Sequence, residues 1–211
     1  MAEEFVKERI LNAGRESFFA LGFSKVTMDE LATQLGISKK TMYKYFPSKD
    51  DLADAVMNWH LREMAVKIKE IVNADVDYLD KLHNLWMYMA EIYSRVSKQC
   101  QDDIRKNRPE LWKRIEEFRR ESILSNFSKL VDEGVRRGIL RSDINKDILV
   151  LMYLNATQGI INPDILMKHS FSATEAYKTI LSIIFDGILH DSARSQYRTK
   201  VASDQPTVRV K

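Results

Sequence analysis

Between positions 27 and 47 the sequence contains the start and stop signals of two short helices separated by a tight turn. This pair of helices is the feature that most constrains the fold. Thr27 and Glu30 form a capping box, in which each residue can satisfy a free backbone N–H of the other at a helix N-terminus. Gly36 ends that helix, Ser38 caps the next one, and Pro47 stops it. Two helices joined by a turn that contains glycine predict a helix-turn-helix.

The rest of the chain also has a helical pattern, and we expect an all-α protein. The 211 residues include only 7 Gly and 4 Pro, which is too few for the frequent turns of an all-β chain. Apolar residues instead recur at spacings of three and four. A second capping box, Ser172 with Glu175, marks a late helix. We predict helices over residues 6–21, 27–35, 38–46, 48–72, 82–96, 109–137, 148–161 and 174–189.

These elements divide the chain into three parts. We expect an N-terminal helix-turn-helix head over residues 1–60, a larger helical body over residues 61–191 and a disordered basic tail over residues 192–211. The single cysteine, Cys100, excludes a disulfide within the chain, which favours a cytoplasmic location. No secretory signal is visible, and the longest uncharged apolar stretch, residues 148–163, is shorter than the roughly 20 residues of a membrane span.

Positive charge is concentrated around the second helix of the predicted helix-turn-helix. Residues 38–49 carry four lysines and no acid. Met42 and Phe46 are four residues apart and can pack into the head, which leaves Lys39, Lys40 and Lys44 on the opposite side. Lysines neutralise DNA phosphates and can donate to guanine in the major groove. The pattern predicts a DNA-reading helix, although such a run of charge is equally typical of a solvated helix face.

The same residues resemble a known family. The segments FALGF (19–23), TMDELA (27–32) and LGISKKTMYKYFPSKDDL (35–52) are similar to the DNA-binding signature of the tetracycline-repressor-like (TetR/AcrR) transcriptional regulators. The resemblance implies a nine-helix-type homodimer that binds double-stranded operator DNA through its first helices and a small-molecule effector in its body. It implies phosphate contacts from Thr27, Thr41, Tyr43 and Lys49, and base contacts from Lys39 and Lys40, flanked by Lys44 and Tyr45.

Two features of the body would serve such a regulator. The late helices carry more apolar surface than one core face needs, so we expect them to form a two-fold interface, although both also fit plain core helices. The interface candidates are Leu151, Leu154, Tyr177, Ile180, Leu181, Ile184 and Ile188. An effector pocket is expected to be apolar and aromatic, although core helices have the same composition. The pocket candidates are Trp86, Met89, Tyr93, Trp112, Phe118, Phe127, Met152 and Tyr153.

The sequence gives little support to an enzyme. The four histidines are scattered, no metal-ligand spacing is present, and glycine-rich nucleotide motifs are absent, so we expect no catalytic residue, metal or cofactor. The adjacent acids Asp102 and Asp103 are interpreted as caps or solvated charge. The most favoured function is a ligand-responsive transcriptional repressor. The alternative is a helical small-molecule-binding or adaptor protein that keeps the head as a scaffold only.

Overall fold

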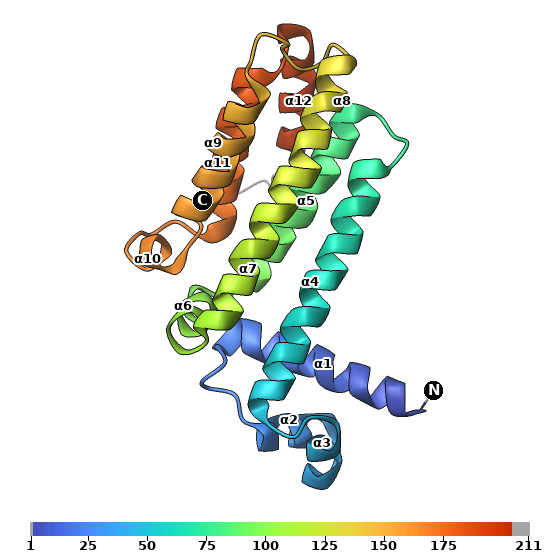
Figure 1. Ribbon diagram of the computed structural model, residues 1–211, viewed down its shortest axis with the longest axis vertical. Coiled ribbons are helices and arrows are strands. Elements are labelled where there is room, and N and C mark those ends of the chain that lie inside the picture. Colours follow the sequence, from blue (N-terminus) through green and yellow to red (C-terminus); the bar gives the residue numbers. More distant parts are fainter. Residues whose placement is uncertain (1, 204–211) are drawn as a thin grey trace, which may run out of the picture.

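The computed structural model describes residues 2–203, and that part of the chain is mainly helical, as the capping signals predict (Figure 1). It contains twelve α-helices, one π-helical turn and an isolated β-bridge between Leu140 and Leu189. This is more than the nine helices that the resemblance implied, because a long rod is interrupted, one helix is a single turn, and a last helix follows the body. None of the helices in residues 2–203 is long and apolar enough to cross a membrane.

The head consists of three helices and the beginning of a fourth. They are α1 (Ala2–Leu21), α2 (Met28–Leu35), α3 (Lys39–Tyr45) and α4 (Lys49–Asn73). The expected signals are all used: Thr27 and Glu30 form the capping box, Gly36 ends α2 in the left-handed conformation (φ +65°), and Ser38 caps α3. Figure 1 shows α2 and α3 at one end of the molecule. Because α4 continues into the body, the expected boundary near residue 60 falls inside this helix.

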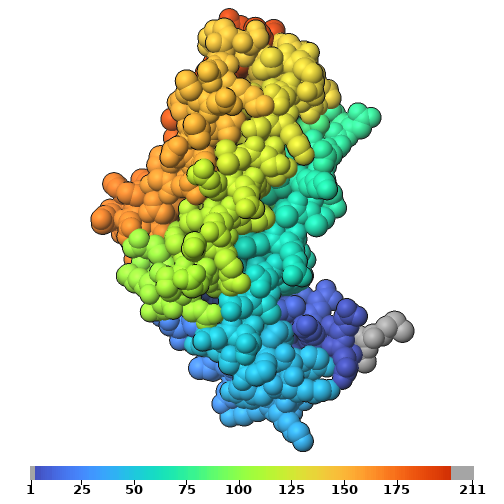
Figure 2. Space-filling view, in the orientation of Figure 1, coloured from blue at the N-terminus to red at the C-terminus, as the bar shows by residue number. Residues whose placement is uncertain are grey.

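The body is a bundle whose long helices run roughly along the molecule (Figure 1). Its elements are α5 (Tyr78–Arg95), α6 (Lys98–Asn107), α7 (Pro109–Ser122), η1 (Ile123–Phe127), α8 (Ser128–Arg136), α9 (Lys146–Ile160), α10 (Pro163–Leu166), α11 (Ala173–Ile188) and α12 (Asp191–Ser203). The helix predicted over 109–137 is one rod, α7–η1–α8, with a π-helical turn in its middle. Figure 2 shows an elongated molecule, with the head at one end and the loop after α8 at the other.

Two apolar cores hold this arrangement together. One lies in the body, between α5, α8, α9 and α11. The other fills the head, but it also includes Cys100, Ile104 and Leu111 from α6 and α7. Because side chains of the body complete the core of the head, a displacement of α6 must disturb the packing beneath the helix-turn-helix.

The predicted disorder of the basic tail is wrong for residues 192–203, which form most of α12. Ala193 and Tyr197 are buried against the body core, and the Tyr197 ring lies 5.4 Å from that of Phe185. Arg198 pairs with Asp186, and Lys200 pairs with acids at the start of α5. The sequence shows a polar segment but not the acidic partners that the fold supplies. Residues 204–211 of the tail lie outside the described residues.

The residues predicted for a two-fold interface also need correction. Of the seven candidates, six are buried inside the subunit's own core: Leu154, Tyr177, Ile180, Leu181, Ile184 and Ile188. Only Leu151 is exposed, because both helices use one face for the core and present a different one to solvent. The outward face of α9 and α11 instead carries Ile148, Leu151, Met152, Ile160 and Ile183. We call these five residues the exposed apolar face.

Candidate nucleic-acid interface and internal cavity

The packing of α3 separates a buried side from a polar side, as predicted. Met42 is fully buried and Phe46 is 4% exposed, so the back of α3 is fixed in the head core. Lys39, Lys40 and Lys44 are exposed, and Tyr43 is 46% exposed. A short helix that is held from behind and polar in front has the shape that the major groove admits.

The lysines of α3 differ in their surroundings. Lys39 forms an ion pair with Asp29 of α2, and Lys44 forms one with Glu3 of α1, with an Nζ–Oε1 distance of 2.7 Å. The hydrogen bond and charge of each acid raise the pKa of the paired lysine. Lys40 has no acidic partner within ion-pair distance among residues 2–203. The segment that lacks acids in sequence is therefore partly neutralised in space, and Lys40 is the lysine of α3 that has no acidic partner among the described residues.

Four other candidates on this surface have partners inside the head. Thr27 caps α2, and its hydroxyl and backbone N–H both donate to Glu30. The Thr41 hydroxyl lies 2.8 Å from that of Ser38. Tyr45 is half-buried against the head core. The Lys49 ammonium donates to the carbonyls of Phe23 and Val26, at 3.1 Å each, and a phosphate would compete with these bonds.

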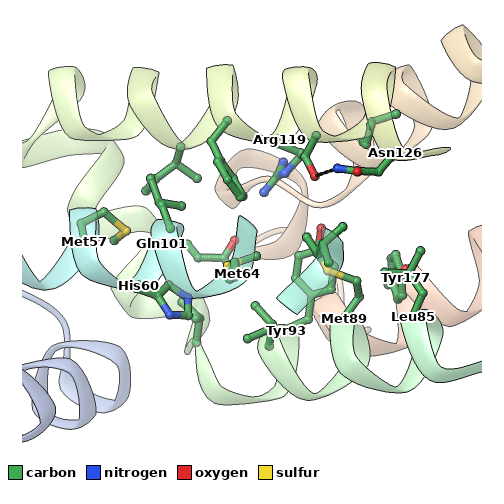
Figure 3. Close-up of a pocket in the computed structure, with 18 of the residues that line it drawn as sticks. Met57, His60, Met64, Leu85, Met89, Tyr93, Gln101, Arg119, Asn126 and Tyr177 are labelled. Carbon is green, nitrogen blue, oxygen red and sulfur yellow. Dashed lines mark hydrogen bonds between the residues drawn. The ribbon is translucent and has the colours of Figure 1, made fainter. Parts of the chain in front are cut away.

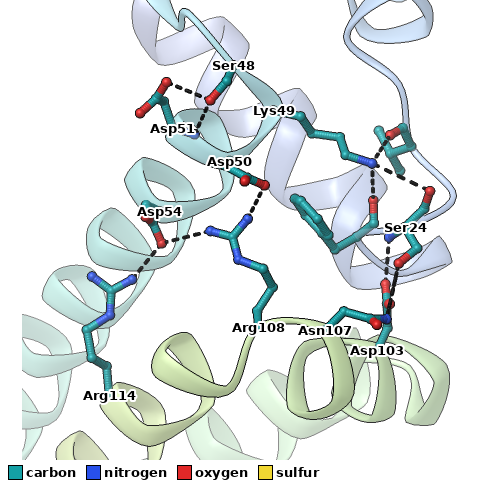
Figure 4. A network of polar contacts seen from close by, with 12 residues as sticks. Ser24, Ser48, Lys49, Asp50, Asp51, Asp54, Asp103, Asn107, Arg108 and Arg114 are labelled. Atoms are coloured by element: carbon teal, nitrogen blue, oxygen red, sulfur yellow. Dashed lines mark hydrogen bonds and ion pairs between the residues drawn. The ribbon is translucent and has the colours of Figure 1, made fainter.

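A network of polar contacts connects the head to α6 and α7 (Figure 4). Asp103 of α6 accepts hydrogen bonds from the backbone N–H of Ser24 at 2.6 Å and from its hydroxyl at 2.5 Å. Arg108, before α7, bridges Asp50 and Asp54 at the start of α4. Burial opposes ionisation of Asp103, but the bonds from Ser24 and Asn107 outweigh it and lower the pKa of this carboxyl. We call these contacts the head–body network.

The body encloses a cavity between α4, α5, α6 and the α7–η1 rod (Figure 3). The space without protein atoms, its opening to solvent included, is about 1100 Å³. One end of the cavity reaches Phe19 of the head, and the other reaches Tyr177 of α11.

Six of the eight pocket candidates line this cavity, and two do not. The six are Met89, Tyr93, Trp112, Phe118, Phe127 and Tyr153. Trp86 is buried in the body core and lies outside the lining formed by the described residues. Met152 is 59% exposed on the outer side of α9, one residue away from the inward-facing Tyr153. Trp86 and Met152 have the residue types expected in a pocket. Neither lines the cavity, because the side of the helix on which a residue lies decides what it contacts.

Several polar groups that sequence reasoning missed also line the cavity. His60 and Gln101 are 8% and 7% exposed, and Arg119, Ser122 and Asn126 lie on the rod. The signal for His60 was present, because it interrupts the apolar i, i+4 stripe of α4 between Val56 and Met64. Gln101 had no comparable signal. The π-helical turn borders the cavity through Ile123, Asn126 and Phe127, and such turns are frequent at functional sites.

Comparison with known proteins identifies the family. Residues 10–56 match the description "Bacterial regulatory proteins, tetR family". An uncharacterized HTH-type transcriptional regulator of Bacillus subtilis, YvaF, is 29% identical over 171 residues, covering 81% of this chain and 88% of YvaF. The chain belongs to the TetR family. This TetR-family protein is a DNA-binding transcriptional regulator, and the family is not one of enzymes.

Solved structures show the same fold along nearly the whole chain of the TetR-family protein. A TetR-family regulator from Agrobacterium tumefaciens has a TM-score of 0.67 at 15% identity, covering 89% of this chain and all of its own. The ketosteroid transcriptional regulator KstR2 of Mycobacterium tuberculosis has a TM-score of 0.56 at 18% identity, covering 88% and 95% of the two chains. The helical head and body are therefore arranged as in regulators of this family.

Proposed function

We propose that this regulator is a homodimeric repressor whose affinity for operator DNA changes when a small molecule occupies the cavity. In this proposal residues 1–60 bind DNA and residues 61–191 bind the effector and the second subunit. The observation that carries the proposal is the position of α6: Gln101 and Ile104 line the cavity, while Asp103 of the same helix binds Ser24 of the head. A ligand that displaces α6 has a direct mechanical route to the helix-turn-helix.

DNA binding is assigned to the front of α3 and its surroundings. Lys40 and Tyr43 point away from the head core, and Lys39 and Lys44 exchange an acidic partner for a phosphate or base when DNA binds. We assign Lys39 and Lys40 to base edges, flanked by Lys44 and Tyr45. Phosphate contacts are assigned to Thr27, Thr41, Tyr43 and Lys49. For Lys49 this requires the release of at least one backbone carbonyl.

The exposed apolar face supports the dimer. Ile183 is 69% exposed and Ile148 is 58% exposed, and no charged side chain interrupts α9 between Asp147 and its end at Ile160. A Cβ added at Gly159 or Gly187, on the same two helices, would meet nothing within 4 Å, which leaves room for close approach of another helix. Two such helices from each subunit would form a four-helix bundle. A dimer is also what places two recognition helices about 34–36 Å apart, on half-sites one turn of DNA apart.

Effector control is a shift between two arrangements of the heads. A ligand changes DNA affinity only by its differential affinity for the two arrangements. The head–body network and the shared core at Cys100, Ile104 and Leu111 couple α6 and α7 to the head. The name of KstR2, a "transcriptional repressor" that is 21% identical over 182 residues, is consistent with repression as the outcome. An adaptor that keeps the head only as a scaffold would need neither an exposed lysine surface nor this coupling.

The experiment is a titration of overlapping DNA duplexes, taken from the region around the protein's own gene, with the full chain. Fluorescence anisotropy gives the affinity, and sedimentation gives the number of chains on each duplex. We expect one duplex to bind well above the others, with two chains or a multiple of two. Equal and weak binding to every duplex would favour the adaptor, and a single chain per duplex would rule out the dimer.

A further inference from the structure

Two buried polar side chains lie at the same end of an otherwise apolar cavity. Gln101 of α6 and His60 of α4 line it and are labelled together near the end that approaches α1 in Figure 3. Each residue is more than nine-tenths buried, neither side chain forms a hydrogen bond with another described residue, and the polar atoms of both keep some accessible surface. Polar atoms that remain accessible in the cavity and are not bonded to the protein are available to hydrogen-bond with a molecule there.

The cavity offers no uncompensated charge to a ligand. The Arg119 guanidinium is bound to Glu116 at 3.0 Å and also donates to the carbonyl of Ile161. Burial, followed by the charges of Arg15 and Arg95, lowers the pKa of His60 to about 4, so its imidazole is neutral at pH 7. Burial also raises the pKa values of Tyr93, Tyr153 and Tyr177, which therefore stay protonated.

Charged ligands are disfavoured by this arrangement. A carboxylate or phosphate would have to displace Glu116 from Arg119, and an ammonium group would find Glu116 already paired. Either ligand would bury a charge against apolar walls without a free counter-ion, which is costly. A neutral hydroxyl or carbonyl instead matches groups that both donate and accept. The Gln101 amide and the neutral imidazole of His60 can each both donate and accept a hydrogen bond.

The cavity is also long. Its lining on α4 extends from Met57 to Ile68, about 16 Å along a helix, and its lining on the rod extends from Trp112 past Ser122. We propose, on the basis of the effector function above, that the cavity takes an uncharged, elongated and mainly hydrocarbon molecule. A hydroxyl or carbonyl oxygen of that molecule is hydrogen-bonded by Gln101 and His60. Because these residues lie on α6 and α4, the polar end of the ligand touches the two helices that reach the head.

The test compares three probes that share a twelve-carbon chain: 1-dodecanol, dodecanoate and dodecylammonium. Binding is measured at pH 7 by intrinsic tryptophan fluorescence, since Trp112 lines the cavity, and by the shift in thermal unfolding. We expect dodecanol to bind at least tenfold more tightly than either ion. Equal or tighter binding of an ion, or no binding of any probe, would overturn the inference.

Three variants separate hydrogen bonding from loss of volume. Gln101→Leu and His60→Phe keep the size of each side chain, and we expect each to lower dodecanol affinity about tenfold, which is 1.4 kcal/mol, with little change for the ions. Ile104→Val, a control on α6, should weaken all three probes alike. Thermal unfolding without ligand checks that each variant is folded. Equal losses for all three probes in the polar variants would contradict the assigned hydrogen bonds.

A last measurement distinguishes this inference from the effector function on which it rests. The anisotropy of the best-bound duplex is followed while each probe is added. If dodecanol binds selectively but leaves DNA affinity unchanged, the ligand class stands and the effector function fails. If an ion binds most tightly and changes DNA affinity, the effector function stands and the neutral ligand class is wrong.

Discussion

Asp103 of α6 accepts two hydrogen bonds from Ser24, one from its backbone N–H and one from its hydroxyl, across the boundary between body and head. Ser24 lies in the turn just before the helix-turn-helix, and residues on either side of Asp103 along α6 face the cavity. Gly22 packs close to the same carboxylate, since a Cβ there would lie 3.1 Å from it. This contact is a direct polar connection between the helix that lines the proposed effector site and the head.

We predict that Asp103→Ala uncouples the cavity from the head. Loss of both Ser24 bonds should leave the fold and the ligand affinity largely intact, but should reduce the change in DNA affinity caused by a bound effector. Asp102→Ala is the matched control, because Asp102 pairs only with Lys106 on its own helix in the described structure. Anisotropy titrations with and without ligand measure the coupling. Equal coupling in the two variants would show that Asp103 does not transmit the signal.

The exposed apolar face leads to a prediction about assembly. Ile183→Glu should convert a dimer to a monomer and weaken DNA binding, because it places a charge at the centre of an apolar contact while leaving the subunit core untouched. Val66→Glu is the control, since Val66 is 59% exposed on α4, away from α9 and α11. Sedimentation velocity at micromolar concentration distinguishes the two states. A dimeric Ile183→Glu variant would place the interface elsewhere.

The ion pair between the buried Lys81 and the half-buried Glu133 predicts the response to acid. Burial alone raises the pKa of Glu133, but the bonds and charges of Lys81 and Arg137 outweigh burial and lower it. The pKa in the folded state is thus below that of the unfolded chain. The pair therefore contributes its full stability above the unfolded value of about 4.5 and loses it as pH falls through the folded value.

Removal of one partner of this pair should cost more than removal of both. Lys81→Met leaves the half-buried Glu133 carboxylate paired with Arg137 but without the Lys81 bonds, and we expect a loss of about 1 to 2 kcal/mol in the free energy of unfolding. The double variant Lys81→Met/Glu133→Leu should lose less and should show a flatter stability profile between pH 3 and pH 5. Urea unfolding at a series of pH values measures both effects. A double variant less stable than Lys81→Met would contradict the role of the pair.

Local sequence signals predicted the helices of the head well, whereas contacts between residues distant in sequence could not be predicted. Thr27, Gly36 and Ser38 determine helix ends through neighbouring backbone groups, so their pattern alone was sufficient. Asp103 looked like solvated charge because its partner, Ser24, is 79 residues away. The predicted disorder of residues 192–203 was wrong for the same reason, since the acids that pair with the cations of this segment lie on other helices.

In the body, the sequence did not predict which side of an apolar helix faces the core. The periodicity of α9 and α11 identified two apolar helices, but both are apolar on two sides, and the sequence does not tell which side meets the core. Ile184 was therefore expected at an interface although it is buried, and the more exposed Ile183 was not. In the same way, Met152 and Tyr153 were both expected in the pocket, and only Tyr153 reaches it.

The central claim, that the lysine side of α3 binds DNA, is tested most directly by the variant Lys39→Ala/Lys40→Ala/Lys44→Ala. The control Lys67→Ala/Lys69→Ala/Lys129→Ala removes three exposed lysines from α4 and α8. Anisotropy of the best-bound duplex is measured over a range of salt concentrations. We predict that the α3 variant, folded by circular dichroism, loses specific binding and lowers the salt slope by about one for each phosphate that is no longer neutralised, while the control binds like the wild type. Unchanged affinity and salt slope in the folded α3 variant would contradict the claim.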